Sequence, residues 1–310
     1  MTDMTSSDTD SSAPADGAER IRRIVVGFDG SDESTAALDE GLTIAARTGA
    51  SVDVLTSWRW PLTWSTAPVG DSWSPLHDAE EVRQHAVALV ERRGPLPVDV
   101  STRSVEGAAT AVLLDAAAGA GLLVVGSRGR GGFRGLLLGS VSAACITHAP
   151  CPVLVHRTGA GSGLAERGSD GARTIVVGVD GSPESAHALR FAVTLARSLG
   201  LRVRTVTTWQ WPPMLNRDEA PFDHWSPEQD ALSAAAPALE AAQDLVGDEV
   251  RLTSELVEGP AAAVLLDASR GAAMLVLGNR GLGGFRGLLV GSVSQECAQH
   301  ASSPVIVHRS

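Results

Sequence analysis

The chain contains two copies of one long pattern, and this repeat constrains the fold more than any other feature. The segment IVVGFDGS at 24–31 returns as IVVGVDGS at 175–182. The segment GSRGRGGFRGLLLGSVS at 126–142 returns as GNRGLGGFRGLLVGSVS at 278–294, with three substitutions. The repeat length of about 150 residues is much longer than the roughly 20–50 residues of a solenoid unit. The 310 residues therefore indicate a duplicated domain of ordinary size.

Composition sets the expected boundaries of the two copies. Residues 1–20 are rich in Ser, Thr, Asp and Ala and have almost no large apolar side chain, which predicts a disordered tail. Residues 159–171, GAGSGLAERGSDG, are typical of a flexible linker. We therefore expect the first domain over 21–158 and the second over 172–310.

Short apolar runs alternate with helical segments in each copy. In the first copy we predict strands over 23–28, 51–57, 98–105, 122–125 and 152–156. The intervening segments predict helices, including one over 108–118, one capped by Ser74 with Pro75 at its first position, and one that begins near Ser140. This alternation predicts α/β domains in which helices cover both faces of a parallel sheet.

Two tandem Rossmann-like, doubly wound domains fit this element order best. Each five-stranded parallel sheet is expected in the order 3-2-1-4-5, because right-handed crossovers leave few topologies. The last strands, PVLVH at 152–156 and PVIVH at 304–308, would lie at sheet edges, which seek pairing. We predict that they pair with each other as an intrachain pseudo-dimer, and we leave a further homodimer open. Pro237 is expected to kink or interrupt the second helix of the second copy.

Candidate ligand-binding residues follow the first and fourth strands of each copy. In a doubly wound sheet the ligand crevice lies at the carboxyl ends of the strands where the strand order reverses. Asp29 and Gly126 stand directly after these strands in the first copy, and Asp180 and Gly278 do so in the second. We therefore expect each pair to meet at one crevice.

The glycine-rich loop after the fourth strand is suited to an anion. In the first copy it reads Gly126-x2-Gly129-x9-Gly139-Ser140 and leads into a helix. The N–H groups of Gly139, Ser140 and Val141 open that helix, where free donors and the helix dipole favour a phosphate. The alternative is a loop that merely turns, and the repetition of the loop favours the phosphate cradle. The loop is no dinucleotide fingerprint, because that motif follows a first strand.

Composition excludes several functional classes. All 25 basic residues are arginine, so a Walker A lysine and a lysine Schiff base are both excluded. The net charge of −11 argues against nucleic-acid binding. No apolar run approaches the ~18 residues of a membrane span. The 3 cysteines exclude a disulfide scaffold, and we expect a cytoplasmic protein.

The motifs resemble those of the universal stress protein family. The resemblance is carried by G-x2-G-x9-G-[S/T] after the fourth strand, by Val-Gly-x-Asp-Gly-Ser at the first strand and by Pro-Val-x-Val at the end of each copy. It covers nearly all of both copies, and is similar to the ATP-binding branch of the family and to its tandem form common in actinobacteria. It implies that ATP binds twice per chain, with Mg²⁺ left open.

The resemblance also implies a role for each motif position. In the first copy Asp29 and Gly126 would hold the ribose, with Asp29 also a candidate for a metal or base contact. Adenine would lie against Gly27, Ser57 and Val125, and phosphates against Gly129, Gly139, Ser140 and Val141. The matching positions of the second copy are Gly178, Asp180, Thr208, Leu277, Gly278, Gly281, Gly291, Ser292 and Val293. Ser127 is replaced by Asn279 and Arg130 by Leu282, so the two sites are expected to differ in affinity.

Three functions remain open at this point. The first is an ATP-binding regulatory module of the stress response, and the second is a slow Mg-dependent ATP hydrolase that uses Asp29 and Asp180. The third is a dimerisation scaffold with vestigial sites. We favour the first, because no general base stands beside the expected phosphates; no catalytic residue is predicted, and enzyme activity would be at most a weak ATPase.

Arginines and tryptophans near the expected crevices each allow two interpretations. Arg128 and Arg280 could neutralise phosphate charge or point to solvent, and we slightly favour the phosphate. The repeated tryptophans after the second strand, which are Trp58, Trp60, Trp209 and Trp211, could wall the adenine. We favour the alternative that they pack within their domains.

Overall fold

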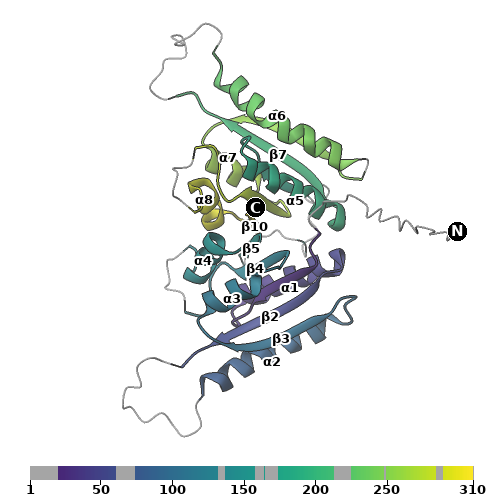
Figure 1. The fold of residues 1–310 in the computed structure, drawn as a ribbon, viewed down its shortest axis with the longest axis vertical. Coiled ribbons are helices and arrows are strands. Elements are labelled where there is room, and N and C mark those ends of the chain that lie inside the picture. The colour runs from purple at the N-terminus through teal and green to yellow at the C-terminus, as the bar shows by residue number, and fades with distance from the viewer. Residues whose placement is uncertain are drawn as a thin grey trace, which may run out of the picture.

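The computed structural model describes residues 20–60, 74–131, 137–157, 164, 174–212, 225–247, 249–283 and 289–309. The tail predicted over 1–20 and the linker predicted over 159–171 lie, apart from Arg20 and Leu164, outside these residues. The chain forms an elongated molecule in which two similar units lie end to end around a shared sheet (Figure 1).

Each half contains the strands and helices that the sequence predicts. The first half consists of β1 (Arg23–Gly27), α1 (Asp32–Thr48), β2 (Ser51–Trp58), α2 (Pro75–Arg93), β3 (Val100–Glu106), α3 (Ala109–Ala117), β4 (Leu122–Gly126), α4 (Ser140–His148) and β5 (Val153–His156). The second half consists of β6 (Thr174–Gly178), α5 (Pro183–Leu199), β7 (Arg202–Trp209), α6 (Pro227–Val246), β8 (Leu252–Glu258), α7 (Ala261–Ala268), β9 (Met274–Gly278), α8 (Ser292–His300) and β10 (Val305–His308).

One ten-stranded sheet runs through the molecule in the order β3-β2-β1-β4-β5-β10-β9-β6-β7-β8. Within each half the strands are parallel and follow the predicted order. The two halves join where β5 pairs antiparallel with β10, and Leu154 lies opposite Ile306. The predicted intrachain pairing of the two last strands is therefore confirmed.

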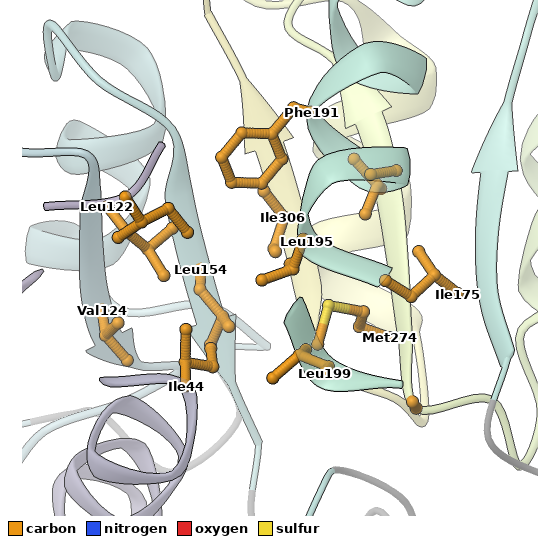
Figure 2. Packing of buried hydrophobic residues seen from close by; sticks show 14 of the residues in the cluster. Ile44, Leu122, Val124, Leu154, Ile175, Phe191, Leu195, Leu199, Met274 and Ile306 are labelled. Carbon is orange, nitrogen blue, oxygen red and sulfur yellow. The ribbon is translucent and has the colours of Figure 1, made fainter. Parts of the chain in front are cut away.

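Apolar layers on both faces of the sheet hold the helices. One layer packs α1, α2, α5 and α6 against the sheet, and the other packs α3, α4, α7 and α8. The first layer crosses the junction between the halves. Figure 2 shows Ile44 and Leu154 from the first half facing Leu195, Leu199 and Ile306 from the second. The halves therefore share a continuous core.

The Asp-Gly-Ser motif after β1 and β6 makes a tight turn into a capped helix. Gly30 has φ 77° and Gly181 has φ 86°, a left-handed conformation that glycine adopts without a Cβ penalty. The next residue caps the helix, since the hydroxyl oxygen of Ser31 accepts a hydrogen bond from the N–H of Ser34 at 3.2 Å. The corresponding bond runs from Ser185 to Ser182. This turn fixes the aspartate at the carboxyl end of the strand.

Two expectations about helices need correction. The prediction that Pro237 interrupts its helix is wrong, because α6 continues through it from Pro227 to Val246. Proline removes one N–H from the helix, but Ala235, Ala242 and Val246 are buried on both sides of it and hold the helix against the rest of the half. Ser74 stands at the N-cap of α2 before Pro75, as predicted, but its side chain makes no capping hydrogen bond.

Candidate functional site

A cavity of about 850 Å³ lies at the carboxyl ends of the strands in the first half. We call it the first crevice. It is formed where the strand order reverses between β1 and β4, with α2 and α3 on its sides. Every site residue predicted for the first copy lines it, namely Gly27, Asp29, Ser57, Val125, Gly126, Gly129, Gly139, Ser140 and Val141. Its size is within the range of small-molecule pockets.

Asp29 ties the two loops of the first crevice together. One carboxylate oxygen accepts hydrogen bonds from the Ser31 N–H at 3.0 Å and the Ser31 hydroxyl at 2.6 Å, and the other accepts one from the Arg130 N–H at 2.8 Å. Burial acts to raise the pKa of Asp29, but these hydrogen bonds and one with Ser34 outweigh it, so the pKa lies below its usual value. A charged carboxylate held in this way is a poor general base.

At two positions of the glycine-rich loop, contacts within the protein explain why the residue is glycine. A Cβ on Gly129 would lie 2.4 Å from a carboxylate oxygen of Asp29. A Cβ on Gly126 would lie 2.8 Å from the backbone carbonyl carbon of Glu33, in the first turn of α1. Both glycines therefore allow β4 and its loop to pack closely on the turn after β1.

No contact within the protein explains why residue 139 is glycine. Its φ of −71° and ψ of 154° suit any residue, and the nearest protein atom to an added Cβ is the Ser127 carbonyl oxygen at 3.4 Å. Gly291 in the second half is similar, with its nearest atom at 3.5 Å. Neither the backbone nor the neighbouring protein atoms require glycine at these two positions.

The donors at the start of α4 differ in part from the prediction. The Gly139 N–H is not free, because it donates to the Ser127 carbonyl at 2.7 Å and closes the glycine-rich loop. Gly139 is the N-cap of α4, so the N–H groups of Ser140 and Val141 lie in the first turn, where no intrahelical acceptor exists. Two of the three predicted donors thus remain available to a ligand in the crevice.

Two arginines of the glycine-rich loop, Arg128 and Arg130, line the first crevice. Arg128 pairs with Glu33 at 2.8 Å across the loop and α1, and its side chain is 46% exposed. The guanidinium of Arg130 lies over the turn, since a Cβ on Gly30 would be 3.0 Å from one of its nitrogens. Arg128 therefore stands at the crevice with part of its guanidinium open to solvent.

Among the repeated tryptophans, Trp60 differs from the expectation of domain packing, whereas Trp58, Trp209 and Trp211 are partly buried. Trp58 lines the first crevice and meets Trp60 edge to face, with ring centroids 6.1 Å apart. Trp60 is 43% exposed, so the packing interpretation is wrong for this residue. Trp58 and Trp60 lie at and just beyond the carboxyl end of β2, outside the buried apolar core.

The second half repeats the first crevice's hydrogen bonds. Asp180 accepts from the Ser182 N–H at 3.0 Å and hydroxyl at 2.6 Å, and from the Leu282 N–H at 2.8 Å. A Cβ on Gly281 would lie 2.3 Å from Asp180, and the Gly291 N–H donates to the Asn279 carbonyl at 2.7 Å. The other predicted residues stand at the same strand ends and helix start as in the first half, namely Gly178, Thr208, Leu277, Gly278, Ser292 and Val293.

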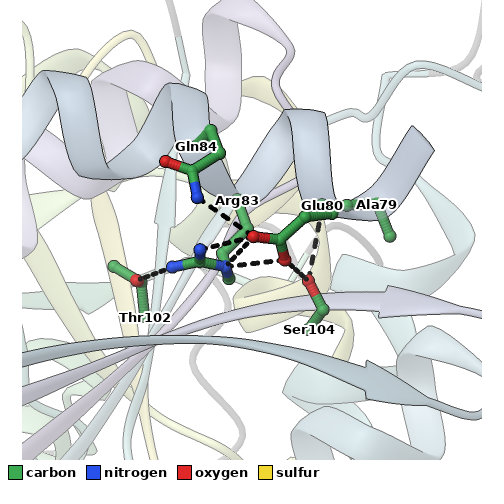
Figure 3. Close-up of polar contacts among 6 residues, drawn as sticks. All are labelled: Ala79, Glu80, Arg83, Gln84, Thr102 and Ser104. Atoms are coloured by element: carbon green, nitrogen blue, oxygen red, sulfur yellow. Dashed lines mark hydrogen bonds and ion pairs between the residues drawn. The ribbon is translucent and has the colours of Figure 1, made fainter. Parts of the chain in front are cut away.

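The second helix of each half is held in a different way. In the first half, Arg83 on α2 bonds Glu80 on the same helix and donates to the Thr102 hydroxyl on β3 at 2.9 Å (Figure 3). The positions of Glu80 and Arg83 are occupied in α6 by Leu232 and Ala235, which cannot form this network. The network therefore fixes α2 over β3, beside the first crevice.

Without that network, α6 packs against α5 and approaches the turn after β6. A Cβ on Gly181 would lie 2.3 Å from the carbonyl oxygen of Ala234 in α6. The matching glycine of the first half, Gly30, faces the movable guanidinium of Arg130 instead. Helix backbone thus covers the turn beside Asp180, whereas a side chain covers the turn beside Asp29.

Comparison with known proteins places this architecture in a family. The sequence profile named "Universal stress protein family" matches residues 20–157 and again residues 171–309. The chain belongs to the universal stress protein family. The resemblance inferred from the motifs is thereby confirmed.

Relatives within the family match this universal stress protein along most of its length. One from Mycobacterium tuberculosis is 32% identical over 292 residues, which cover 92% of this chain and 96% of the relative. One from Mycolicibacterium smegmatis is 32% identical over 306 residues, with the same coverage of both chains. The solved structure of a universal stress protein from Archaeoglobus fulgidus is similar in fold, with a TM-score of 0.64 at 18% identity over 94% of this chain and 99% of its own. A universal stress protein solved in complex with cAMP matches 44% of this chain and 97% of its own, with 28% identity and a TM-score of 0.34.

Some residues of the first crevice in this universal stress protein were missed by sequence reasoning. Asp78, Ala79 and Val82 of α2 line it, as does Leu113 of α3. The inward faces of the predicted helices could have indicated them. Ser142, whose hydroxyl donates to the Gly126 carbonyl at 2.6 Å, was also missed, although it belongs to the repeated GSVS segment.

The described residues also bear on membrane insertion and metal binding. No helix of that part of the universal stress protein is long and apolar enough to cross a membrane. The same residues contain no group of three or more His, Cys, Asp and Glu side chains that could hold a metal ion.

Proposed function

We propose that this universal stress protein binds ATP in the first crevice and acts as a nucleotide-dependent regulatory module of the stress response. The observation that carries the proposal is the start of α4. There, a glycine that the protein itself does not require stands beside two first-turn N–H groups at one end of a cavity of about 850 Å³. This combination fits a phosphate chain and would gain nothing in a loop that merely turns.

The phosphates of ATP would lie against the start of α4. The N–H groups of Ser140 and Val141 would donate to phosphate oxygens, and the helix dipole adds a favourable field. The absence of a side chain at Gly139 would let a phosphate approach the backbone. Arg128 would add a cation without losing its bond to Glu33, since a guanidinium has five N–H donors.

The nucleoside would occupy the apolar part of the crevice. Adenine would lie near Gly27, Ser57 and Val125, with Trp58 and Leu113 as further walls. The ribose would lie near Gly126, beside the turn that Asp29 holds in place. In this arrangement Asp29 contributes chiefly by fixing the loops, because its oxygens already accept three hydrogen bonds. Mg²⁺, if it accompanies ATP, would draw ligands mainly from the phosphates.

Slow turnover is part of the proposal. Efficient phosphoryl transfer needs a positioned base or water-orienting group. The pKa of Asp29 is lowered and its oxygens are engaged, so it does not supply one. We expect hydrolysis by the purified protein far below the ~1–100 s⁻¹ of kinases. A turnover in that range, in protein free of contaminating ATPase, would instead establish the hydrolase alternative.

We use the term second crevice for the corresponding strand ends of the second half, around Asp180 and the start of α8. We propose that it binds ATP more weakly. It keeps the glycine and serine at the start of α8, but α6 covers its turn and Leu282 replaces Arg130. Two nucleotides per chain with unequal affinity follow from this asymmetry.

Calorimetric titration of nucleotide-stripped protein with ATP, and separately with cAMP, tests the proposal. We expect saturable ATP binding. The Ser140 hydroxyl would also donate to a phosphate oxygen, so Ser140→Ala should weaken binding by about 1.5–3 kcal/mol, the value of a hydrogen bond to a charged group. The matched Ser292→Ala variant should leave the tighter site unchanged. Preference for cAMP would redirect the proposal to a cyclic nucleotide, and a lack of binding to either would overturn it.

A further inference from the structure

A second cavity, of about 520 Å³, lies in the second half at the end of the sheet opposite the crevice. We call it the arginine cavity. It opens at the amino ends of β6, β7 and β8, and four arginines line it: Arg202, Arg204, Arg251 and Arg270. Thr174 and Thr253 add hydroxyl groups, and no acidic residue is among the lining residues. In a protein with a net charge of −11, such a concentration of positive charge is unusual.

Two of the four arginines of the cavity have an acidic partner, and the other two have none among the described residues. Arg204 lies 3.5 Å from Glu255 and donates from one terminal nitrogen to the Ala268 carbonyl, whereas its Nε is buried with no hydrogen-bond partner. Arg270 pairs with Asp267, but both side chains are 74% exposed, and such pairs are weak. Within the described part of the chain, Arg202 and Arg251 have no acidic partner. Like charges around one cavity repel one another, so a bound anion would relieve an unfavourable arrangement.

The first half serves as an internal comparison, because the repeat aligns the same positions. Arg204 stands in β7 where Asp53 stands in β2, and Thr174 stands in β6 where Arg23 stands in β1. In the first half Arg23 pairs with Asp53 at 3.1 Å and donates to the Ala116 and Ala118 carbonyls at 2.9 and 2.7 Å. There a large side chain is engaged by the protein itself.

The second half distributes these charges differently. Threonine replaces the large Arg23 side chain, and arginine replaces the acid that neutralised it. The two flanking positions change in the same direction, since Arg202 replaces Ser51 and Arg251 replaces Asp99. Arg204 takes over a contact of Arg23, since it donates to the Ala268 carbonyl, which matches that of Ala116. It also pairs with Glu255, which stands where Arg103 stands in the first half. Arg202 and Arg251 are therefore the arginines that the second half adds without an acidic partner among the described residues.

We propose that the arginine cavity binds a small oxyanion that carries two or more negative charges, of the phosphate class. Guanidinium groups match phosphate and carboxylate oxygens in pairs, and arginines on adjacent strands suit a tetrahedral group with several oxygens. The cavity is separate from both crevices, so this site does not depend on the proposed ATP binding.

Pyrophosphate is the probe for the test, with citrate as the carboxylate of comparable charge. Titration uses the full chain carrying Gly139→Glu and Gly291→Glu, so that binding at the crevices does not contribute. We expect saturable pyrophosphate binding that weakens as salt is raised. Tighter binding of citrate would keep the site but assign it to carboxylates, which overturns the phosphate class.

Variants that restore the residues of the first half supply the decisive comparison. The double variant Thr174→Arg and Arg204→Asp recreates the Arg23–Asp53 pair of the first half. Because Glu255 stands where Arg103 pairs with Asp53, circular dichroism checks that the variant folds. It should raise the dissociation constant for pyrophosphate by about tenfold or more, as loss of a charge-assisted contact does. Arg202→Ser should raise this dissociation constant by a smaller factor. The control Arg47→Ser, which makes the same change in charge at an exposed position of α1, should leave it unchanged.

Two results would overturn the proposal. One is pyrophosphate binding that is equal in the double variant and in Arg47→Ser, which would show that the anion binds elsewhere. The other is the absence of saturable binding at low salt. Circular dichroism, and ATP titration of the same arginine variants in the background with intact crevices, check that any loss comes from the cavity.

Discussion

At the scale of single residues, Asp29 and Asp180 stand out. Each holds the turn after the first strand of its half against the glycine-rich loop. Each accepts three hydrogen bonds from protein donors, and each would collide with a side chain at Gly129 or Gly281. The sequence places the aspartates and glycines near one another, but it does not indicate that they satisfy each other. Gly139 differs, since neither its backbone conformation nor the neighbouring protein atoms require glycine.

Asp29→Asn should therefore destabilise the fold even without nucleotide. An amide has one acceptor oxygen, so its NH2 group would face a backbone N–H that now lacks an acceptor. We expect a loss of about 1–3 kcal/mol in the free energy of unfolding, measured by urea denaturation of the stripped protein. Asp115→Asn, an exposed change on α3, is the control and should cost little. Equal stability of both variants would contradict the tying role of Asp29.

At the scale of secondary-structure elements, helix α1 carries a buried acid, Glu40. Glu40 is 2% exposed and accepts hydrogen bonds from the Leu164 N–H, the nearer at 3.2 Å. Burial raises the pKa of Glu40 from 4.5 to about 7, because the charged form loses hydration. The protonated form is thus favoured in the folded protein. Its contribution to stability is fully present below pH 4.5 and is lost as pH rises through about 7.

Glu40→Gln should remove this pH dependence. Compared with wild type, the variant should be relatively more stable at pH 8 than at pH 5, by roughly 1–3 kcal/mol. Urea unfolding at the two pH values measures the difference, and the exposed Glu91→Gln is the control. A difference between wild type and Glu40→Gln that does not change with pH would show that Glu40 is charged in the folded state.

Elements were predictable from sequence where a local pattern decides them. The alternation of apolar runs placed every strand of the first half within two residues, and the repeat carried these positions to the second half. Prediction failed where tertiary contacts decide. The bond from Gly139 to the Ser127 carbonyl closes a loop across twelve residues, and packing carries α6 through Pro237. The approach of α6 to Gly181 is a tertiary contact of the same kind, which only the structure reveals.

The whole molecule is one sheet with a shared core, although its sequence is that of two domains. Leu154 and Ile306 are fully buried, and they face each other across the antiparallel junction of β5 and β10. Pairing of two apolar edge strands was predictable from the sequence, because each copy of the repeat ends with the same Pro-Val-x-Val pattern. The packing of α1 against α5 across the junction was not.

Leu154→Ala should therefore destabilise both halves at once. A cavity at a buried leucine costs about 2–5 kcal/mol. Differential scanning calorimetry should show one transition, shifted down as a unit, because the apolar layer is continuous across the junction. Val26→Ala, a buried change within the first half, is the comparison and should also shift the single transition. Separate transitions for the two halves would contradict a shared core.

The most direct test of the account is the number of ATP molecules bound when each helix start is blocked. Titration calorimetry on stripped wild type should give about two sites of unequal affinity; Gly139→Glu should remove the tighter and Gly291→Glu the weaker, since each carboxylate repels phosphate and fills its place. Ala263→Glu, an exposed change on α7, should retain both. The double glutamate variant should bind no ATP. Unchanged ATP binding by that double variant, with an intact circular dichroism spectrum, would contradict the placement of phosphates at the starts of α4 and α8.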